Sequence, residues 1–145
     1  MTELLQDDEY ERRFAGVAKI YGEDSFSHYE KSHVMVIGIG GVGSWAVEAL
    51  ARSGVGELSL VDMDVVAASN INRQLPAMST TLGHEKIAVM AERCHAINPR
   101  IKINLIDDYL TPENIKEILA GNPDLILDCI DDRSEERRVG KECDL

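Results

Sequence analysis

A glycine-rich segment lies between an apolar run and a stretch with helical periodicity. It reads Gly38-Ile-Gly40-Gly41-Val-Gly43. Gly38 permits a tight turn, and Gly40 and Gly41 let backbone N–H groups come close to a phosphate. Gly43 allows the following helix to pack tightly against the strand. Because a helix N-terminus also offers unpaired N–H donors and a positive dipole to an anion, the segment predicts a phosphate-binding loop.

A carboxylate stands at the end of the next apolar run. Asp62 follows Gly43 by 19 residues and ends the run Glu57–Asp62. A carboxylate at this place accepts hydrogen bonds from the ribose hydroxyls of an adenine nucleotide. The two features together predict nucleotide binding. The alternative to nucleotide binding is that the glycines only form a structural turn and that Asp62 is a solvated aspartate at the end of a strand.

Further polar residues favour phosphate chemistry over hydride transfer. The guanidinium of Arg73 is a planar set of donors suited to a phosphate, and Lys86 supplies a compact charge. Lys86 falls in the first turn of a predicted helix, where a cation costs roughly 0.3–1 kcal/mol against the dipole. A bound anion would offset that cost. The alternative places Lys86 in solvent and pairs Arg73 with an acidic neighbour. Other candidate nucleotide-binding residues are Asp64, Asn70 and Gln74.

The segment Asp128-Cys-Ile-Asp131-Asp132 follows a late apolar run. Mg²⁺ prefers oxygen ligands and the phosphates of a substrate. Carboxylates at a strand end beside a triphosphate therefore predict a Mg²⁺ site, with Asp131 as its candidate ligand.

The elements that would position these residues alternate along the chain. Such alternation is typical of parallel strands joined by right-handed crossovers, so we predict an α/β Rossmann-like sheet with helices on both faces, truncated after the fourth strand. The predicted strands are His33–Ile39, Glu57–Asp62, Ile101–Ile106 and Asp124–Ile130. The predicted helices are Glu23–Lys31, Val42–Ser53 with Trp45 in the core, His84–Asn98, and a helix capped by Thr111 and ended by Gly121.

Composition sets the class of protein. The chain has 145 residues, 44% of them hydrophobic, and a net charge of -11, as expected for one ordinary globular domain. The net negative charge does not attract a nucleic-acid backbone through the overall electrostatic field, although a local basic site remains an open alternative.

The cysteines do not indicate a metal site, because Cys94, Cys129 and Cys143 lack the spacing of zinc ligands. The acidic N-terminus and the absence of an apolar run near 18 residues predict a cytoplasmic protein without a membrane segment.

These motifs resemble the ThiF/MoeB/HesA group of ubiquitin-activating-like adenylating enzymes. The resemblance is carried by Gly38–Ser44, the Asp62-Met-Asp64 triplet, Asn70–Gln74, Lys86 and Asp128–Asp131. Three further segments, Arg12–Gly22, Gly38–Arg52 and Asp107–Asn114, resemble one branch, the tRNA threonylcarbamoyladenosine dehydratases.

The resemblance implies ATP-dependent activation of a carboxylate as an acyl-adenylate, followed in this branch by dehydration and cyclisation of N6-threonylcarbamoyladenosine in tRNA. It places Gly40, Gly41 and Asp62 on the nucleotide and Asn70 near the phosphates. Arg73 and Lys86 would stabilise the developing phosphate charge, and Asp131 would bind Mg²⁺. Arg13 would reach into the site of a partner subunit, which implies a homodimer. A sulfur-transfer partner protein is a further expectation.

Three alternatives stay open. The acceptor of the adenylate could be a ubiquitin-like sulfur carrier of the thiamine or molybdopterin pathway. A nicotinamide-dependent oxidoreductase would use the same glycine loop, but it would not need Arg73 and Lys86. A nucleotide-sensing module would bind ATP without catalysis.

The end of the chain differs from the rest. Arg133–Leu145 has no apolar period, and its first 11 letters, RSEERRVGKEC, resemble a translated sequencing adapter. We therefore expect an incomplete adenylation domain over residues 1–132 and a non-native or disordered tail over residues 133–145. The chain on its own is then expected to be inactive and to expose an apolar sheet edge. The alternative for the tail is a solvated charged helix.

Overall fold

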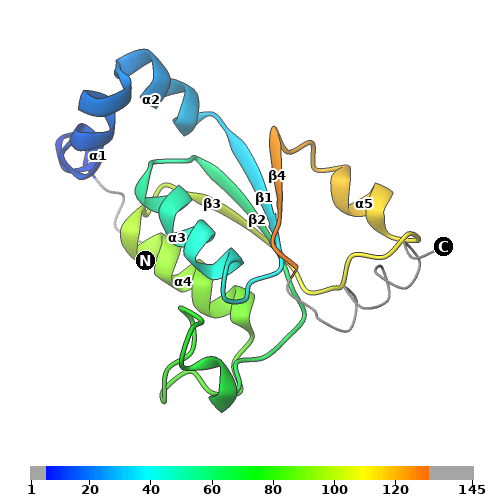
Figure 1. The fold of residues 1–145 in the computed structure, drawn as a ribbon. Coiled ribbons are helices and arrows are strands. Elements are labelled where there is room, and N and C mark those ends of the chain that lie inside the picture. Colours follow the sequence, from blue (N-terminus) through cyan, green and yellow to red (C-terminus); the bar gives the residue numbers. More distant parts are fainter. Residues whose placement is uncertain (1–5, 131–145) are drawn as a thin grey trace.

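The computed structural model describes residues 6–130, whose framework is one sheet of four parallel strands (Figure 1). The order across the sheet is β3-β2-β1-β4, so the chain turns back at β1 to add β4 on its other side. This confirms the predicted Rossmann-like architecture. The strands are β1 (His33–Ile37), β2 (Glu57–Val61), β3 (Lys102–Ile106) and β4 (Leu125–Asp128).

Two helices, α3 (Gly43–Arg52) and α4 (Lys86–Ile97), cover one face of the sheet (Figure 1). Val47 and Ala51 of α3 and Met90 of α4 are fully buried against this face. The predicted apolar side of α4 is confirmed, since Ile87, Met90, Ala91 and Cys94 are buried and Ile97 packs against them. This layer is the larger core of the domain.

The buried side of α3 differs from the prediction. Trp45 is 54% exposed, whereas the small residues Gly43 and Ser44 face the sheet together with Val47. The tight turn before α3 brings its first residues so close to β1 that a large side chain does not fit there. Trp45 therefore points outward, and the prediction of a core tryptophan was wrong.

The opposite face of the sheet carries α5 (Ile115–Leu119). Ile118 of this helix packs with Met35 and Val61 in a second, smaller core. The helix begins later than predicted because reciprocal hydrogen bonds between Thr111 and Asn114 first close a turn, with the Asn114 Oδ1 accepting from the Thr111 N–H at 2.7 Å. Thr111 thus caps this turn, and Asn114 is the N-cap residue of the helix itself.

Two helices before the sheet, α1 (Asp7–Tyr21) and α2 (Glu23–Glu30), pack on each other through Tyr10, Phe14 and Phe26. Of the two, α2 is predicted from the sequence and α1 is not. A signal for α1 is nevertheless present, because three acidic residues open the helix, and Tyr10, Phe14 and Ala18 follow at four-residue spacing.

The outer strand β4 lies at the edge of the sheet. Its residues Leu125 and Ile126 are 52% and 41% exposed, so the expected exposed apolar edge is observed among the described residues. No helix in residues 6–130 is long and apolar enough to span a bilayer. The predicted tail, residues 133–145, lies outside the described residues.

Candidate nucleotide-binding site

A cavity of about 370 Å³ opens at the carboxyl ends of β1 and β2, beside the end of β4. Since the strand order reverses between β1 and β4, this is the place where open α/β sheets bind ligands. Segments far apart in the sequence meet there. Nine predicted site residues line the cavity: Gly38, Gly40, Gly41, Asp62, Asp64, Asn70, Arg73, Gln74 and Lys86.

The glycine loop owes its shape to two positions. Gly38 has φ +90°, and a Cβ there would lie 2.8 Å from the carbonyl oxygen of Cys129. A Cβ on Gly43 would lie 1.7 Å from the carbonyl oxygen of Gly38. These two glycines therefore set the turn and the close helix packing, as predicted, while Gly40 and Gly41 stand open to the cavity.

Asp62 binds the loop from the adjacent strand. Its Oδ2 accepts a hydrogen bond from the Ile39 N–H at 2.7 Å, and its Oδ1 accepts one from the Asp64 N–H at 2.8 Å. A carboxylate has about four acceptor sites, so each oxygen can also accept from a ribose hydroxyl. Asp62 is thus both a structural link and a candidate ligand of the nucleotide.

Lys86 is a buried cation at the cavity. It is 6% exposed, and its Nζ lies 3.8 Å from the Asp64 Oδ2, which forms a loose ion pair. The alternative of a solvated Lys86 was therefore wrong. Because a buried ammonium is unfavourable without close compensation, this position favours a bound anion in the cavity.

Arg73 belongs to the long segment between β2 and α4, which includes the short 3₁₀ helix η1 (Ala68–Asn70). Its Nη1 donates to the carbonyl oxygen of Ser69 and to the Asn72 Oδ1, both at 3.0 Å. Among the described residues it has no acidic partner, so the alternative ion pair is absent. The Trp45 Nε1 donates to the Arg73 carbonyl oxygen at 3.0 Å and ties this segment to α3.

Neighbouring polar groups complete the wall. Gln74 is buried, and its Oε1 has no hydrogen-bond partner within residues 6–130. Asn70 holds its own turn by accepting from the Ala67 N–H at 2.9 Å. Ser44 accepts from the Leu75 N–H at 3.2 Å, which fixes the segment against the start of α3.

Two residues of the wall, Asp108 and Tyr109, were not among the predicted site residues. The Tyr109 hydroxyl donates to the Asp64 Oδ1 at 2.8 Å, so Asp64 lies between Tyr109 and Lys86. Their position in the sequence could have identified them as site residues. They follow β3 directly, and the carboxyl ends of parallel strands share one edge of the sheet.

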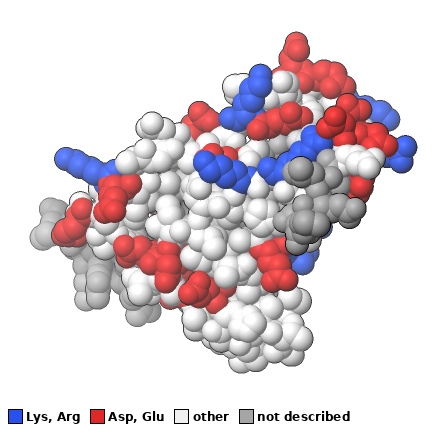
Figure 2. All heavy atoms as spheres, turned by 180° about the vertical axis from the view of Figure 1, so that it is seen from behind, with Lys and Arg blue, Asp and Glu red and all other residues white. Residues whose placement is uncertain are grey.

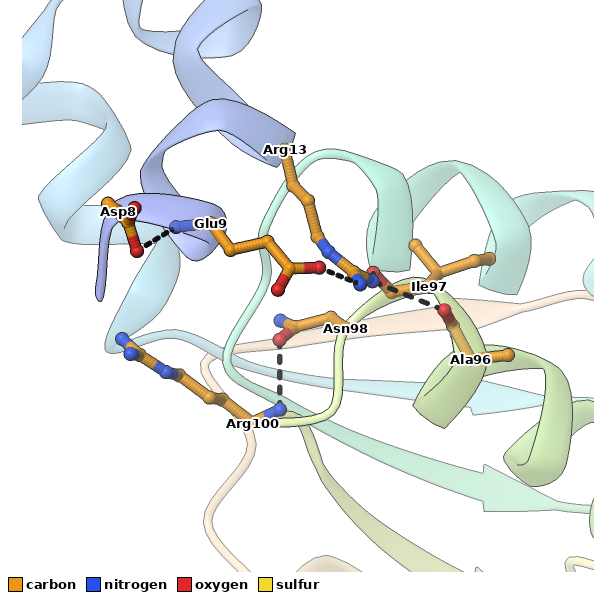
Figure 3. A network of polar contacts seen from close by, with 7 residues as sticks. All are labelled: Asp8, Glu9, Arg13, Ala96, Ile97, Asn98 and Arg100. Atoms are coloured by element: carbon orange, nitrogen blue, oxygen red, sulfur yellow. Dashed lines mark hydrogen bonds and ion pairs between the residues drawn. The ribbon is translucent and has the colours of Figure 1, made fainter. Parts of the chain in front are cut away.

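Arg13 lies away from the cavity. Its Nη1 donates to the carbonyl oxygen of Ile97 at 2.9 Å, and its Nη2 pairs with Glu9 at 2.9 Å (Figure 3). Within one chain it therefore binds the C-terminal end of α4.

Asp131, the candidate Mg²⁺ ligand, lies outside the described residues, and residues 6–130 contain no cluster of three or more metal-binding side chains.

Neither described cysteine has thiolate character. Burial, together with the nearby charge of Glu48, raises the pKa of the Cys94 thiol to about 12. The half-buried Cys129 borders the cavity, and burial, followed by the charge of Asp128, also raises its pKa. Both are free thiols. Burial therefore favours the neutral thiol at Cys129, the described cysteine that borders the cavity.

A comparison with protein families finds that the model of the ThiF family matches residues 10–144. The chain belongs to the ThiF family. The match includes the glycine loop, the Asp62–Asp64 turn and the segment that carries Arg73. This ThiF chain therefore belongs to its family along nearly all of the residues that the structure describes.

Relatives include the tRNA threonylcarbamoyladenosine dehydratase of Haemophilus influenzae, 52% identical over 90% of this chain and 50% of the relative. The molybdopterin-synthase adenylyltransferase of Salmonella typhimurium is 35% identical over 77% of this chain and 45% of its own length. A crystal structure of the Escherichia coli dehydratase with ATP matches with a TM-score of 0.85 and 42% identity over 90% of this chain and 53% of that protein. The chain thus spans about half the length of these relatives.

Proposed function

We propose that this cavity binds ATP and that the whole protein uses it to activate a carboxylate by adenylation. The observation that carries the proposal is the buried ammonium of Lys86, which faces the cavity and has only Asp64 at 3.8 Å as an ion-pair partner among the described residues. A polyphosphate would supply the missing negative charge. The Escherichia coli relative crystallised with ATP supports the choice of nucleotide.

We propose tRNA carrying N6-threonylcarbamoyladenosine as the substrate. Its side-chain carboxylate would attack the α-phosphate of ATP, forming an acyl-adenylate and releasing pyrophosphate. Attack on the activated carbonyl by a nucleophilic atom of the same side chain would then close the ring and release AMP, a better leaving group than a carboxylate oxygen. The dehydratase relative at 52% identity supports this choice.

We propose roles for these residues that the family resemblance implies and their positions at the cavity support. Gly40 and Gly41 would present backbone N–H groups to the phosphates, and Asp62 would accept from the ribose. Arg73 and Lys86 would stabilise charge that grows as pyrophosphate leaves, so their contribution is electrostatic and needs no covalent step. Asn70 and Gln74, which line the cavity from the same segment as Arg73, would also contact the phosphates.

Mg²⁺ fits this site as a companion of the nucleotide. It keeps several waters and substrate phosphates as ligands and needs one or two carboxylates from the protein. Asp131 would provide one, and the exposed carboxylate of Asp64 at the cavity is available as a second. When bound, the ion would neutralise phosphate charge.

A homodimer is part of the proposal. The family resemblance implies that Arg13 acts in the site of a second subunit, and its position away from the nucleotide cavity of its own chain leaves it available for this role. It would then exchange its contacts with Glu9 and Ile97 for the nucleotide. We also propose a cytoplasmic location and a sulfur-transfer partner protein.

A second candidate acceptor is the C-terminus of a ubiquitin-like sulfur carrier. The molybdopterin-synthase adenylyltransferase at 35% identity supports it, but the dehydratase relative at 52% identity favours tRNA. Exchange of labelled pyrophosphate into ATP tests the choice. Exchange that requires modified tRNA supports the first acceptor, and exchange that requires a carrier protein supports the second. Absence of exchange with either acceptor in an assay of the whole protein would contradict adenylation.

A further inference from the structure

A groove of about 580 Å³ lies between α1 and α2, the two helices that precede the sheet (Figure 1). Its lining combines aromatic rings with carboxylates. The rings are those of Tyr10, Phe14 and Phe26, and the carboxylates are those of Asp7, Glu11, Glu23 and Glu30. Arg100 is the one basic residue of the lining among the described residues. We call this set of residues the acidic groove.

The acidic groove already holds a guanidinium of its own chain. The Arg100 Cζ lies 4.3 Å from the centre of the Tyr10 ring, and the Arg100 Nη2 donates to the Asp7 Oδ1 at 2.6 Å. The first contact is a cation–π interaction and the second is a charge-assisted hydrogen bond. An aromatic face beside a carboxylate therefore binds an arginine side chain at this place.

Negative charge remains in the groove after this contact. Glu11 and Glu23 are exposed, and neither forms an ion pair with any residue that the structure describes. The whole chain has a net charge of -11, and acidic side chains are spread over much of the face seen in Figure 2, with basic ones among them. Both the local carboxylates and the overall field therefore attract a cationic partner.

The acidic groove opens on a different side of α1 from Arg13. Glu11 and Ala15 line the groove, and each is two residues from Arg13, which corresponds to about 200° around an α-helix. Arg13 instead contacts Glu9 and the carbonyl oxygen of Ile97. A second subunit that receives Arg13 approaches that other side of the helix and leaves the groove accessible.

We propose that the acidic groove binds a basic segment of a partner protein, in which arginine side chains alternate with apolar ones. The apolar stems of the arginines pack on the aromatic lining, and their charged ends pair with Glu11 and Glu23. A nucleic acid does not fit this groove, because its phosphates would face carboxylates. The inference goes beyond the nucleotide chemistry and holds for either proposed acceptor.

The test is the fluorescence anisotropy of a labelled peptide in which arginine and leucine alternate, titrated with the whole protein. The control peptide has citrulline in place of arginine, which keeps the shape without the charge. We expect only the arginine peptide to bind, and more weakly as salt rises. Glu11→Gln and Glu23→Gln should each weaken binding by about 1.5- to 5-fold, as is usual for an exposed ion pair. Glu117→Gln, the same change on the exposed surface of α5, should leave the affinity unchanged.

A variant of Arg100 should have the opposite effect. Arg100→Gln uncovers the Tyr10 ring and leaves Asp7 without this partner, so a guanidinium of the peptide can take the vacated place. We expect the arginine peptide to bind about two- to fivefold more tightly, the usual value of an exposed cation–π contact. A residue that only supported the fold would not strengthen binding when it is replaced.

Equal affinity for the two peptides would overturn the proposal, as would unchanged affinity in the Glu11→Gln/Glu23→Gln double variant or an equal loss in Glu117→Gln. Unchanged or weaker binding in Arg100→Gln would also overturn it. If the double variant alters the mass of the assembly in sedimentation but not the peptide affinity, the occupant is a second copy of this chain and the proposal is wrong. Because all the substituted side chains are exposed, each variant should remain folded, which its melting temperature checks.

Discussion

The Oδ2 of Asp62 accepts a hydrogen bond from the N–H of Ile39 at 2.7 Å. This contact joins the end of β2 to the glycine loop that follows β1. Asp62 therefore positions the loop as well as facing the cavity. A substitution at Asp62 consequently changes two things, the ligand contact and the loop, and variants must separate them.

We expect Asp62→Asn to keep the acceptor for Ile39 and to weaken ATP binding by roughly 1.5–3 kcal/mol, because a charged acceptor of the ribose is lost. Asp62→Ala should show the same loss of ATP affinity and also a lower melting temperature, because the acceptor for Ile39 is removed as well. Calorimetric titration and thermal unfolding measure the two effects. Equal ATP affinity in Asp62→Asn and the parent would remove the ribose assignment.

In the whole protein, Arg73→Ala and Lys86→Ala should lower kcat for pyrophosphate exchange more than they raise the KM for ATP. The reason is that the phosphate charge they face grows in the transition state. Lys86→Met is the matched control for packing at this buried position, because it keeps the length of the side chain without the charge. An increase in KM alone, with kcat intact, would make both residues binding groups.

Two glycines of one loop should respond differently to alanine. Gly43→Ala places a Cβ 1.7 Å from the Gly38 carbonyl oxygen, so we expect a loss of about 3 kcal/mol or more in the free energy of unfolding. Gly41→Ala meets only Arg73, at 3.5 Å, and should fold normally but bind ATP more weakly. Denaturant unfolding and ATP titration check the pair. A Gly43→Ala protein as stable as the parent would contradict the described turn.

Glu48→Gln should destabilise the protein by about 1–2 kcal/mol at neutral pH, a value reduced from that of a buried pair because Arg52 is largely exposed. The folded-state pKa of Glu48 is lowered, so its ionised form stabilises the fold above its ordinary value of 4.5. That stabilisation is lost as the pH falls through the folded-state pKa. Urea unfolding of both proteins from pH 7 to pH 3 should therefore show a shrinking difference; a constant difference would contradict this role.

Trp45 is the single tryptophan of the chain, and its Nε1 binds the carbonyl oxygen of Arg73. We expect its fluorescence to change when ATP fills the cavity, because the Arg73 segment would move toward the phosphates. Trp45→Phe removes the signal and serves as the control. An unchanged spectrum at an ATP concentration that calorimetry shows to be saturating would contradict this coupling.

The sequence alone determined the parallel α/β architecture and most of the nucleotide cavity. Apolar runs of strand length, each followed by a helical period, leave few other folds, and residues directly after parallel strands meet at one edge of the sheet. This is why the order of the elements along the chain is enough to bring Gly38, Asp62 and Lys86 near one another. The role of each remains a prediction.

The tertiary structure decided which way individual side chains point. Trp45 has the spacing of a core residue, yet the close approach of α3 to β1 leaves room there only for small residues, so it lies outside and holds the Arg73 segment. Likewise, nothing in the spacing of Arg13, Arg52 and Arg93 along the chain indicates that they share a cavity. Such a juxtaposition depends on how three separate helices pack, and helical periodicity defines the face of each helix but not its neighbours.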